Sequence, residues 1–180
     1  YGRILPPTAD ALLDICPLPC VMGITPNVTL ASEVEEILTS TLPSVNRTIA
    51  QRTTMGVVSR YDFEVSIGGQ FVMGSITLAD ANNASIRSLS FNAQFPLRTL
   101  FEKWGTPDCV QINLYDGIPA AGVLSWQRAT YFAQALFVFQ APTPAWNTAL
   151  VQSVMIAGFP TDCGTDMQTW RGFAPVWSYQ

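Results

Sequence analysis

The chain has 180 residues, a length that fits one domain with a sizeable hydrophobic core. Its 9 basic and 13 acidic side chains leave a net charge of −4, and the basic residues are scattered singly, so the surface has no basic stripe for nucleic acid. Histidine is absent, which removes the most frequent general base and metal ligand. We therefore exclude most hydrolase and metalloenzyme schemes and expect neither a metal nor another cofactor.

The N-terminal segment, residues 1–22, is rich in proline: it contains Pro6, Pro7, Pro17 and Pro19. This spacing predicts an extended strap or stalk, with at most one helical turn between Thr8 and Leu13. The chain begins at Tyr1 without a methionine, which favours a cleaved signal or a membrane anchor upstream of Tyr1.

The first predicted helix runs from Leu30 to Thr41. Thr29 can cap it, and its apolar stripe consists of Leu30, Val34, Ile37 and Leu38. The residues that follow favour an antiparallel meander of three strands, with short turns at Gly68-Gly69 and at 80–83. The predicted strands are Val57–Ile67, Gln70–Leu78 and Ser85–Phe91.

A second helix begins at Pro96 and ends at Gly105, because Leu97, Leu100, Phe101 and Trp104 recur at helical spacing. Three more strands are predicted after it, Cys109–Tyr115, Gly122–Gln127 and Thr130–Phe139. One further strand is predicted in the tail, at Val151–Ile156.

These elements predict an α+β fold made of two similar halves, each a helix plus three antiparallel strands, that form one domain. The domain spans residues 23–180, with half-repeats at about 23–91 and 92–140 and a tail over 141–180. The Pro-rich strap precedes it.

The even number of cysteines indicates two disulfides among Cys16, Cys20, Cys109 and Cys163, and three pairings remain open. The spacing of Cys16 and Cys20 is C-x₃-C instead of the C-x₂-C of thiol oxidoreductases, so a redox role is a minor alternative. Asn27, Asn46 and Asn83 each begin an N-glycosylation sequon. Disulfides and sequons together predict an extracytoplasmic protein, secreted or on the cell surface.

Asp62 and Glu64 are two residues apart on a predicted strand and so lie on one face, as two cooperating carboxylates of a hydrolase would. With Arg60 on the same face, a solvated charge ladder is the simpler interpretation. The tail contains three tryptophans, which either pack on the sheet or form a contact surface: Trp146, Trp170 and Trp177.

The run from Pro17 to Thr29, with its P-C-x-x-G-I-x-P-x-x-T pattern, resembles uncharacterised surface-exposed proteins of green non-sulfur bacteria. Asn27 stands where those proteins usually have glycine, and the run Trp104-Gly105-Thr106-Pro107-Asp108 is similar to a second element of theirs. The helix-then-sheet pattern is also similar to the β-lactamase-inhibitor protein and to small outer-membrane assembly lipoproteins. Both are binding modules, so the resemblance implies binding as a function.

We therefore expect a non-catalytic extracytoplasmic domain that binds protein partners, or a structural subunit of a surface or membrane-associated assembly. The alternative is a histidine-free hydrolase that uses Asp62 and Glu64.

Overall fold

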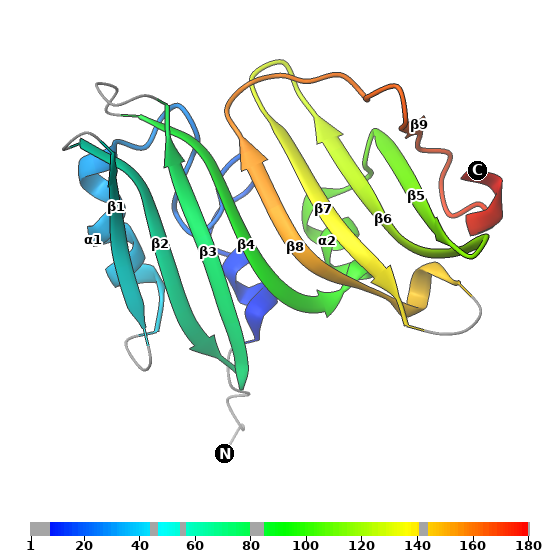
Figure 1. The fold of residues 1–180 in the computed structure, drawn as a ribbon, viewed down its shortest axis with the longest axis horizontal. Helices are drawn as coiled ribbons and strands as arrows, with labels where there is room; N and C mark the ends of the chain where they lie inside the picture. Colours follow the sequence, from blue (N-terminus) through cyan, green and yellow to red (C-terminus); the bar gives the residue numbers. More distant parts are fainter. Residues whose placement is uncertain (1–7, 44–46, 55–56, 80–84, 141–143, 180) are drawn as a thin grey trace.

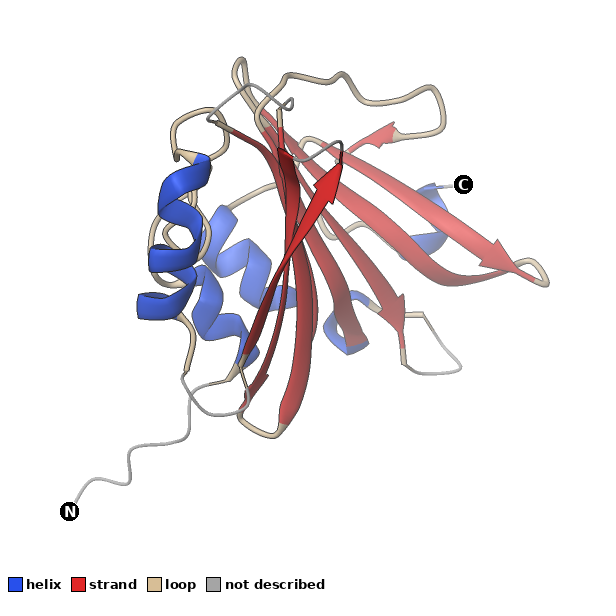
Figure 2. Cartoon of the chain, turned by 60° about the vertical axis from the view of Figure 1, so that its left-hand side comes forward, coloured by secondary structure: helices blue, strands red, loops and turns tan. Residues whose placement is uncertain are grey.

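The computed structural model describes residues 8–43, 47–54, 57–79, 85–140 and 144–179. Within these ranges the chain forms one antiparallel sheet of nine strands, and its two α-helices lie on one face of that sheet (Figure 1, Figure 2). The helices are α1 (Val34–Thr41) and α2 (Leu97–Trp104), and four short 3₁₀ helices are η1 (Ala9–Leu13), η2 (Ala31–Glu33), η3 (Trp146–Thr148) and η4 (Val176–Tyr179). The strands are β1 (Thr48–Thr54), β2 (Val57–Ile67), β3 (Gln70–Leu78), β4 (Ile86–Pro96), β5 (Cys109–Tyr115), β6 (Ile118–Gln127), β7 (Phe132–Phe139), β8 (Ala149–Ala157) and β9 (Gln168–Thr169).

The strand order is β1-β2-β3-β4-β8-β7-β6-β5-β9. Four strands follow α1 along the chain, and β5 to β8 follow α2. The two groups join where β4 pairs with β8, with Phe91 opposite Val154. The centre of the sheet is therefore built from strands that are far apart in the sequence.

This topology corrects the predicted fold class, because the sheet dominates and the units of a helix plus three strands are wrong. Strand β1 was not predicted: its side chains are almost all exposed, so Thr48–Thr54 lacks the alternation of a half-buried strand. Strand β8 was assigned to a tail after residue 140, yet it pairs with both β4 and β7.

The predicted strap also requires correction where the structure describes it, from Thr8 onward. Ala9, Leu12 and Leu13 are buried in the core, and the amide of Met22 donates a hydrogen bond to the carbonyl of Leu12. Because three apolar side chains lie within the five residues of η1, burying this segment removes more apolar surface from water than a surface strap would. Residues 1–7 lie outside the described part of the chain.

Helix α2 illustrates how the sequence pattern sets the packing. Leu97, Leu100 and Trp104 are buried against the sheet, and Gly105 ends the helix with a φ of 73°, a conformation that glycine adopts easily. Trp104 meets the buried Trp126 of β6 edge-on, with ring centroids 5.2 Å apart, and the Trp126 indole donates to the carbonyl of Gly105. The ion pair of Lys103 with Asp14 connects the helix to the N-terminal segment.

Candidate functional site

The candidate site is the face of the sheet opposite α1 and α2. Side chains alternate along each strand, so Tyr61 and Phe63 of β2 point towards the helices, while Asp62 and its alternate neighbours point away from them. The hydroxyl of Tyr61 donates to the carbonyl of Ala31 beside α1, which fixes this assignment. We call the other side the open face; its members include Arg52, Arg60, Asp62, Glu64, Phe71, Met73, Ser75, Ser90, Asn92, Gln94, Leu136, Gln152 and Ser153.

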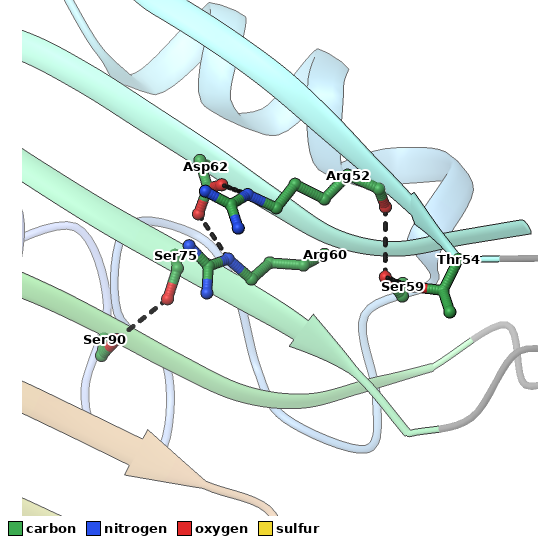
Figure 3. Close-up of polar contacts among 7 residues, drawn as sticks. All are labelled: Arg52, Thr54, Ser59, Arg60, Asp62, Ser75 and Ser90. Carbon is green, nitrogen blue, oxygen red and sulfur yellow. Dashed lines mark hydrogen bonds and ion pairs between the residues drawn. The ribbon is translucent and has the colours of Figure 1, made fainter.

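One end of the open face is charged (Figure 3). Arg52 of β1 and Arg60 of β2 are cross-strand partners, an arrangement in which two like charges would repel. Asp62 lies beside both, and its carboxylate accepts from Nε of Arg52 at 2.9 Å and from Nε of Arg60 at 2.5 Å. The carboxylate thus neutralises the repulsion, and both of its oxygens are occupied by guanidinium groups.

Serine and threonine hydroxyls surround this charged cluster. Ser59 donates to the carbonyl of Arg52 at 3.2 Å and lies 3.1 Å from the hydroxyl of Thr54. On the neighbouring strands, the hydroxyls of Ser75 and Ser90 lie 3.2 Å apart. Figure 3 shows these contacts running across the strands, so the hydroxyls hold neighbouring strands together in addition to the backbone ladder.

The middle of the open face is hollowed where β4 meets β8. A hollow of about 520 Å³ has Asn92, Gln94 and Ser153 along its floor, with Phe71 of β3 and Leu136 of β7 at its sides. A second hollow of about 330 Å³ extends over the charged cluster and includes Asn92 as well. The two hollows therefore meet at Asn92 and form one depression across the centre of the sheet.

A β-bulge shapes the floor of this depression. The register between β4 and β8 shifts between Asn92 and Phe95, and the side chain of Gln70 spans the irregularity. Its amide nitrogen donates to the carbonyl of Gln94 at 2.8 Å, while its oxygen accepts from the backbone amide of Gln94 at 3.3 Å. These bonds satisfy the backbone amide and carbonyl of Gln94, which lies beyond Asn92, the last residue of β4 that pairs with β3.

Asp62 and Glu64, the predicted carboxylate pair, do share the open face. The structure brings Asp62 together with Arg52 and Arg60, whereas Glu64 is exposed two residues farther along β2. No group of three or more potential metal ligands occurs among the described residues.

The expectation of two disulfides is confirmed, and the pairs are Cys16–Cys20 and Cys109–Cys163. The two cysteines of the C-x₃-C motif are therefore bonded to each other. Cys109 is fully buried on β5, so its disulfide attaches the segment after β8 to the far half of the sheet.

Of the three predicted sequons, the structure describes the asparagine of one, Asn27. Asn27 is exposed, has a φ of 63°, and donates its side-chain amide to the carbonyl of Gly158. The hydroxyl of Thr29, in the same sequon, accepts the backbone amide of Thr25 at 2.8 Å. Asn46 and Asn83 lie outside the described residues.

Trp146 and Trp170 belong to an aromatic cluster on the helix side of the sheet. Their rings meet edge-on at 5.1 Å, and Trp146 also contacts Phe137 of β7 at 5.8 Å. Both side chains are half-buried and are thus neither wholly core nor a free surface. The side chain of Trp177 lies outside the described part of the structure.

Sequence reasoning missed the apolar members of the open face. Phe71, Met73 and Leu136 have exposed fractions of 60%, 45% and 39%. The alternation in β3 could have placed Phe71 and Met73 beside Asp62, since the Gly68-Gly69 turn fixes the register of β2 and β3. The position of Leu136 on the open face could not have been predicted this way. Leu136 is on β7, which lies near β3 only because β4 pairs with β8.

Comparisons with protein-family models, with curated proteins and with solved structures give no match for this chain. Within the described residues, no helix is both long and apolar enough to cross a membrane.

Proposed function

We propose that this chain is a non-catalytic extracytoplasmic binding domain that engages a folded protein partner through the open face. The observation that carries the proposal is the central depression, in which exposed apolar side chains adjoin a charged cluster on the helix-free side of the sheet. The two disulfides are typical of extracytoplasmic proteins and support the compartment.

The composition of the face supports a protein partner. Interface centres are enriched in aromatic residues, methionine and arginine, and the depression presents Phe71, Met73 and Arg52. Amide side chains such as Asn92 and Gln152 supply both donors and acceptors for a partner's backbone. A partner loop with apolar and charged side chains fits this arrangement best.

The size of the face also supports the proposal. The depression lies on the five neighbouring strands β2, β3, β4, β8 and β7, with Arg52 of β1 at its edge. At about 4.8 Å between strands and about 3.3 Å per residue they cover roughly 24 by 30 Å, which is close to the ~800 Å² per partner of a standard interface.

The arrangement around Asp62 supports binding over hydrolysis. A glycosidase-like pair needs one carboxyl group that holds a proton and another that faces the substrate. Asp62 instead forms charge-assisted hydrogen bonds with two arginines. Such a fixed cluster is suited to orienting a charged partner, because rim charges steer association and set register.

The test compares purification of the wild type and four variants of the chain from a cell-surface fraction, with mass spectrometry of co-purifying proteins. Met73→Glu and Leu136→Glu place charges in the depression, while Val28→Glu and Leu114→Glu are controls at equally or more exposed apolar positions elsewhere. We expect one stoichiometric partner with the wild type and both controls, and its loss with Met73→Glu and Leu136→Glu. A partner retained by those two variants, or a lone wild-type monomer, contradicts the proposal.

A further inference from the structure

A separate hollow of about 450 Å³ lies away from the open face, beside α2. Phe101 of α2, Trp146 of η3 and Phe173 of the C-terminal segment form its apolar walls, and Arg98 and Asn147 are its polar members. Trp146 contacts Phe137, whose side chain points to the helix side of the sheet, so this aromatic hollow is on the other side of the molecule from the depression.

The walls of the aromatic hollow are held by their own contacts. Phe101 and Phe173 lie 4.9 Å apart between ring centroids. The indole nitrogen of Trp146 donates to the carbonyl of Ala174 at 2.8 Å, which uses its one polar group and leaves the ring as an apolar surface. The hydrogen bond to Ala174 therefore fixes the Trp146 ring as one wall of the hollow before any ligand binds.

The C-terminal segment that carries Phe173 is also fixed in place. The backbone amide of Trp170 donates to the carbonyl of Asp108 at 2.8 Å, and its ring stacks on Tyr179. The Tyr179 hydroxyl donates to the carbonyl of Gly172 at 2.6 Å and accepts from the amide of Arg171 at 2.9 Å. Phe173 is nevertheless 65% exposed, so the segment holds a large apolar ring at the mouth of a hollow that it does not fill.

Arg98 has no structural explanation among the described residues. It forms no ion pair or hydrogen bond with them, including Glu102 one turn farther along α2. Its position in the first turn of α2 is unfavourable for a cation, because the helix dipole places partial positive charge there. A negative group held at Arg98 would remove this penalty.

We propose that the aromatic hollow binds a small aromatic or alicyclic anion. The ring of the ligand lies against Phe101, Trp146 and Phe173, and its carboxylate or sulfonate accepts hydrogen bonds from Arg98 and the amide of Asn147. Ligand pockets typically have about 300–1,000 Å³, apolar walls and a few polar groups that fix orientation, which is the pattern here. This site is independent of partner binding at the open face.

The test uses 8-anilinonaphthalene-1-sulfonate as an anionic probe and N-phenyl-1-naphthylamine as its uncharged counterpart, with the disulfide-bonded chain. Binding is followed by probe emission and by energy transfer from tryptophan. We expect saturable binding of both probes at one site. Arg98→Gln should weaken binding of the sulfonate about tenfold or more, because a charge-assisted hydrogen bond is lost, and leave the uncharged probe unaffected.

Phe173→Ser should weaken both probes, since it removes a wall of the hollow. Its matched control is Phe71→Ser on the open face, where the phenylalanine is 60% exposed and outside the hollow. Equal near-ultraviolet circular dichroism of all variants shows that each is folded. Sulfonate binding unchanged in Arg98→Gln, or binding lost in Phe71→Ser and kept in Phe173→Ser, overturns the proposal and leaves the protein-partner proposal intact.

Discussion

The ring of Phe63 on β2 covers Gly74, its direct cross-strand partner on β3. A Cβ atom at residue 74 would lie 2.2 Å from the tip of that ring and 2.7 Å from the carbonyl oxygen of Ser90. The second group of strands has the same kind of pair, in which Phe137 of β7 covers Gly122 of β6. Here the glycine is on the earlier strand and the phenylalanine on the later one. Glycine is required at both positions because a Cβ atom would overlap a phenylalanine ring and a backbone carbonyl oxygen, that of Ser90 at Gly74 and that of Gln111 at Gly122.

Gly74→Ala and Gly122→Ala should each destabilise the fold by about 1–3 kcal/mol, the usual range for overpacking. Urea unfolding of the disulfide-bonded chain measures the effect. Gly164→Ala is the control, since a Cβ there meets no atom within 4 Å. A loss in Gly164→Ala as large as in Gly74→Ala would refute this explanation.

Tyr61 should make stability depend on alkaline pH. Burial raises the pKa of its phenol above the ordinary value of 10.0, and the negative charge of Glu35 raises it further. The folded state therefore binds the phenolic proton more tightly than the unfolded state, so this stability is complete below pH 10 and is lost as the pH rises through the raised pKa.

Tyr61→Phe provides the comparison, because phenylalanine cannot ionise. Below pH 10 we expect the wild type to be more stable by about 1 kcal/mol, owing to the hydrogen bond from Tyr61 to Ala31. Urea unfolding at a series of pH values should show this advantage shrinking above pH 10. Parallel curves for the two proteins would contradict the assignment.

The two disulfides should differ in their contribution to stability. The Cys109–Cys163 pair closes a loop with a sequence separation of 54, against 4 for Cys16–Cys20. Chain entropy alone gives about 4 kcal/mol for the longer loop and about 2 kcal/mol for the shorter one. Urea unfolding of C109A/C163A and C16A/C20A double variants measures both, and equal losses would show that loop length is not the deciding factor.

Asn27 occupies a backbone conformation that suits glycine, with a φ of 63°. Asparagine tolerates the left-handed region better than most residues, whereas alanine does not. Asn27→Ala should therefore cost about 1–2 kcal/mol of stability, and Asn27→Gly less. Thermal unfolding compares the pair, and an alanine variant as stable as the glycine variant would be inconsistent with the strain.

Local features of the fold could be predicted from sequence because they depend on neighbours along the chain. The pattern of Leu97, Leu100 and Trp104 specifies α2, and Gly105 marks its end. The hairpin turns at Gly68-Gly69 and Asp116-Gly117 place both central residues at positive φ, as two-residue hairpin loops require.

Features that depend on distant contacts could not be predicted in this way. Strand β8 shows an apolar run, yet nothing within that run specifies Phe91 as the partner of Val154. The prediction of the charged cluster was incomplete for a related reason. The alternation of β2 places Asp62 beside Arg60, but Arg52 joins the cluster from β1, whose polar sequence does not predict a strand.

The pairing of β4 with β8 has a consequence for biosynthesis. While the chain is being made, β1 to β4 can assemble as soon as residue 96 has left the ribosome or translocation channel, but β4 then exposes its backbone donors and acceptors along one edge. That edge stays open until Ala149–Ala157 has been synthesised. An unpaired edge invites strands from other chains. The nascent protein therefore passes through a stage that is more prone to aggregation than its finished form, and a chain truncated before β8 would remain in that stage.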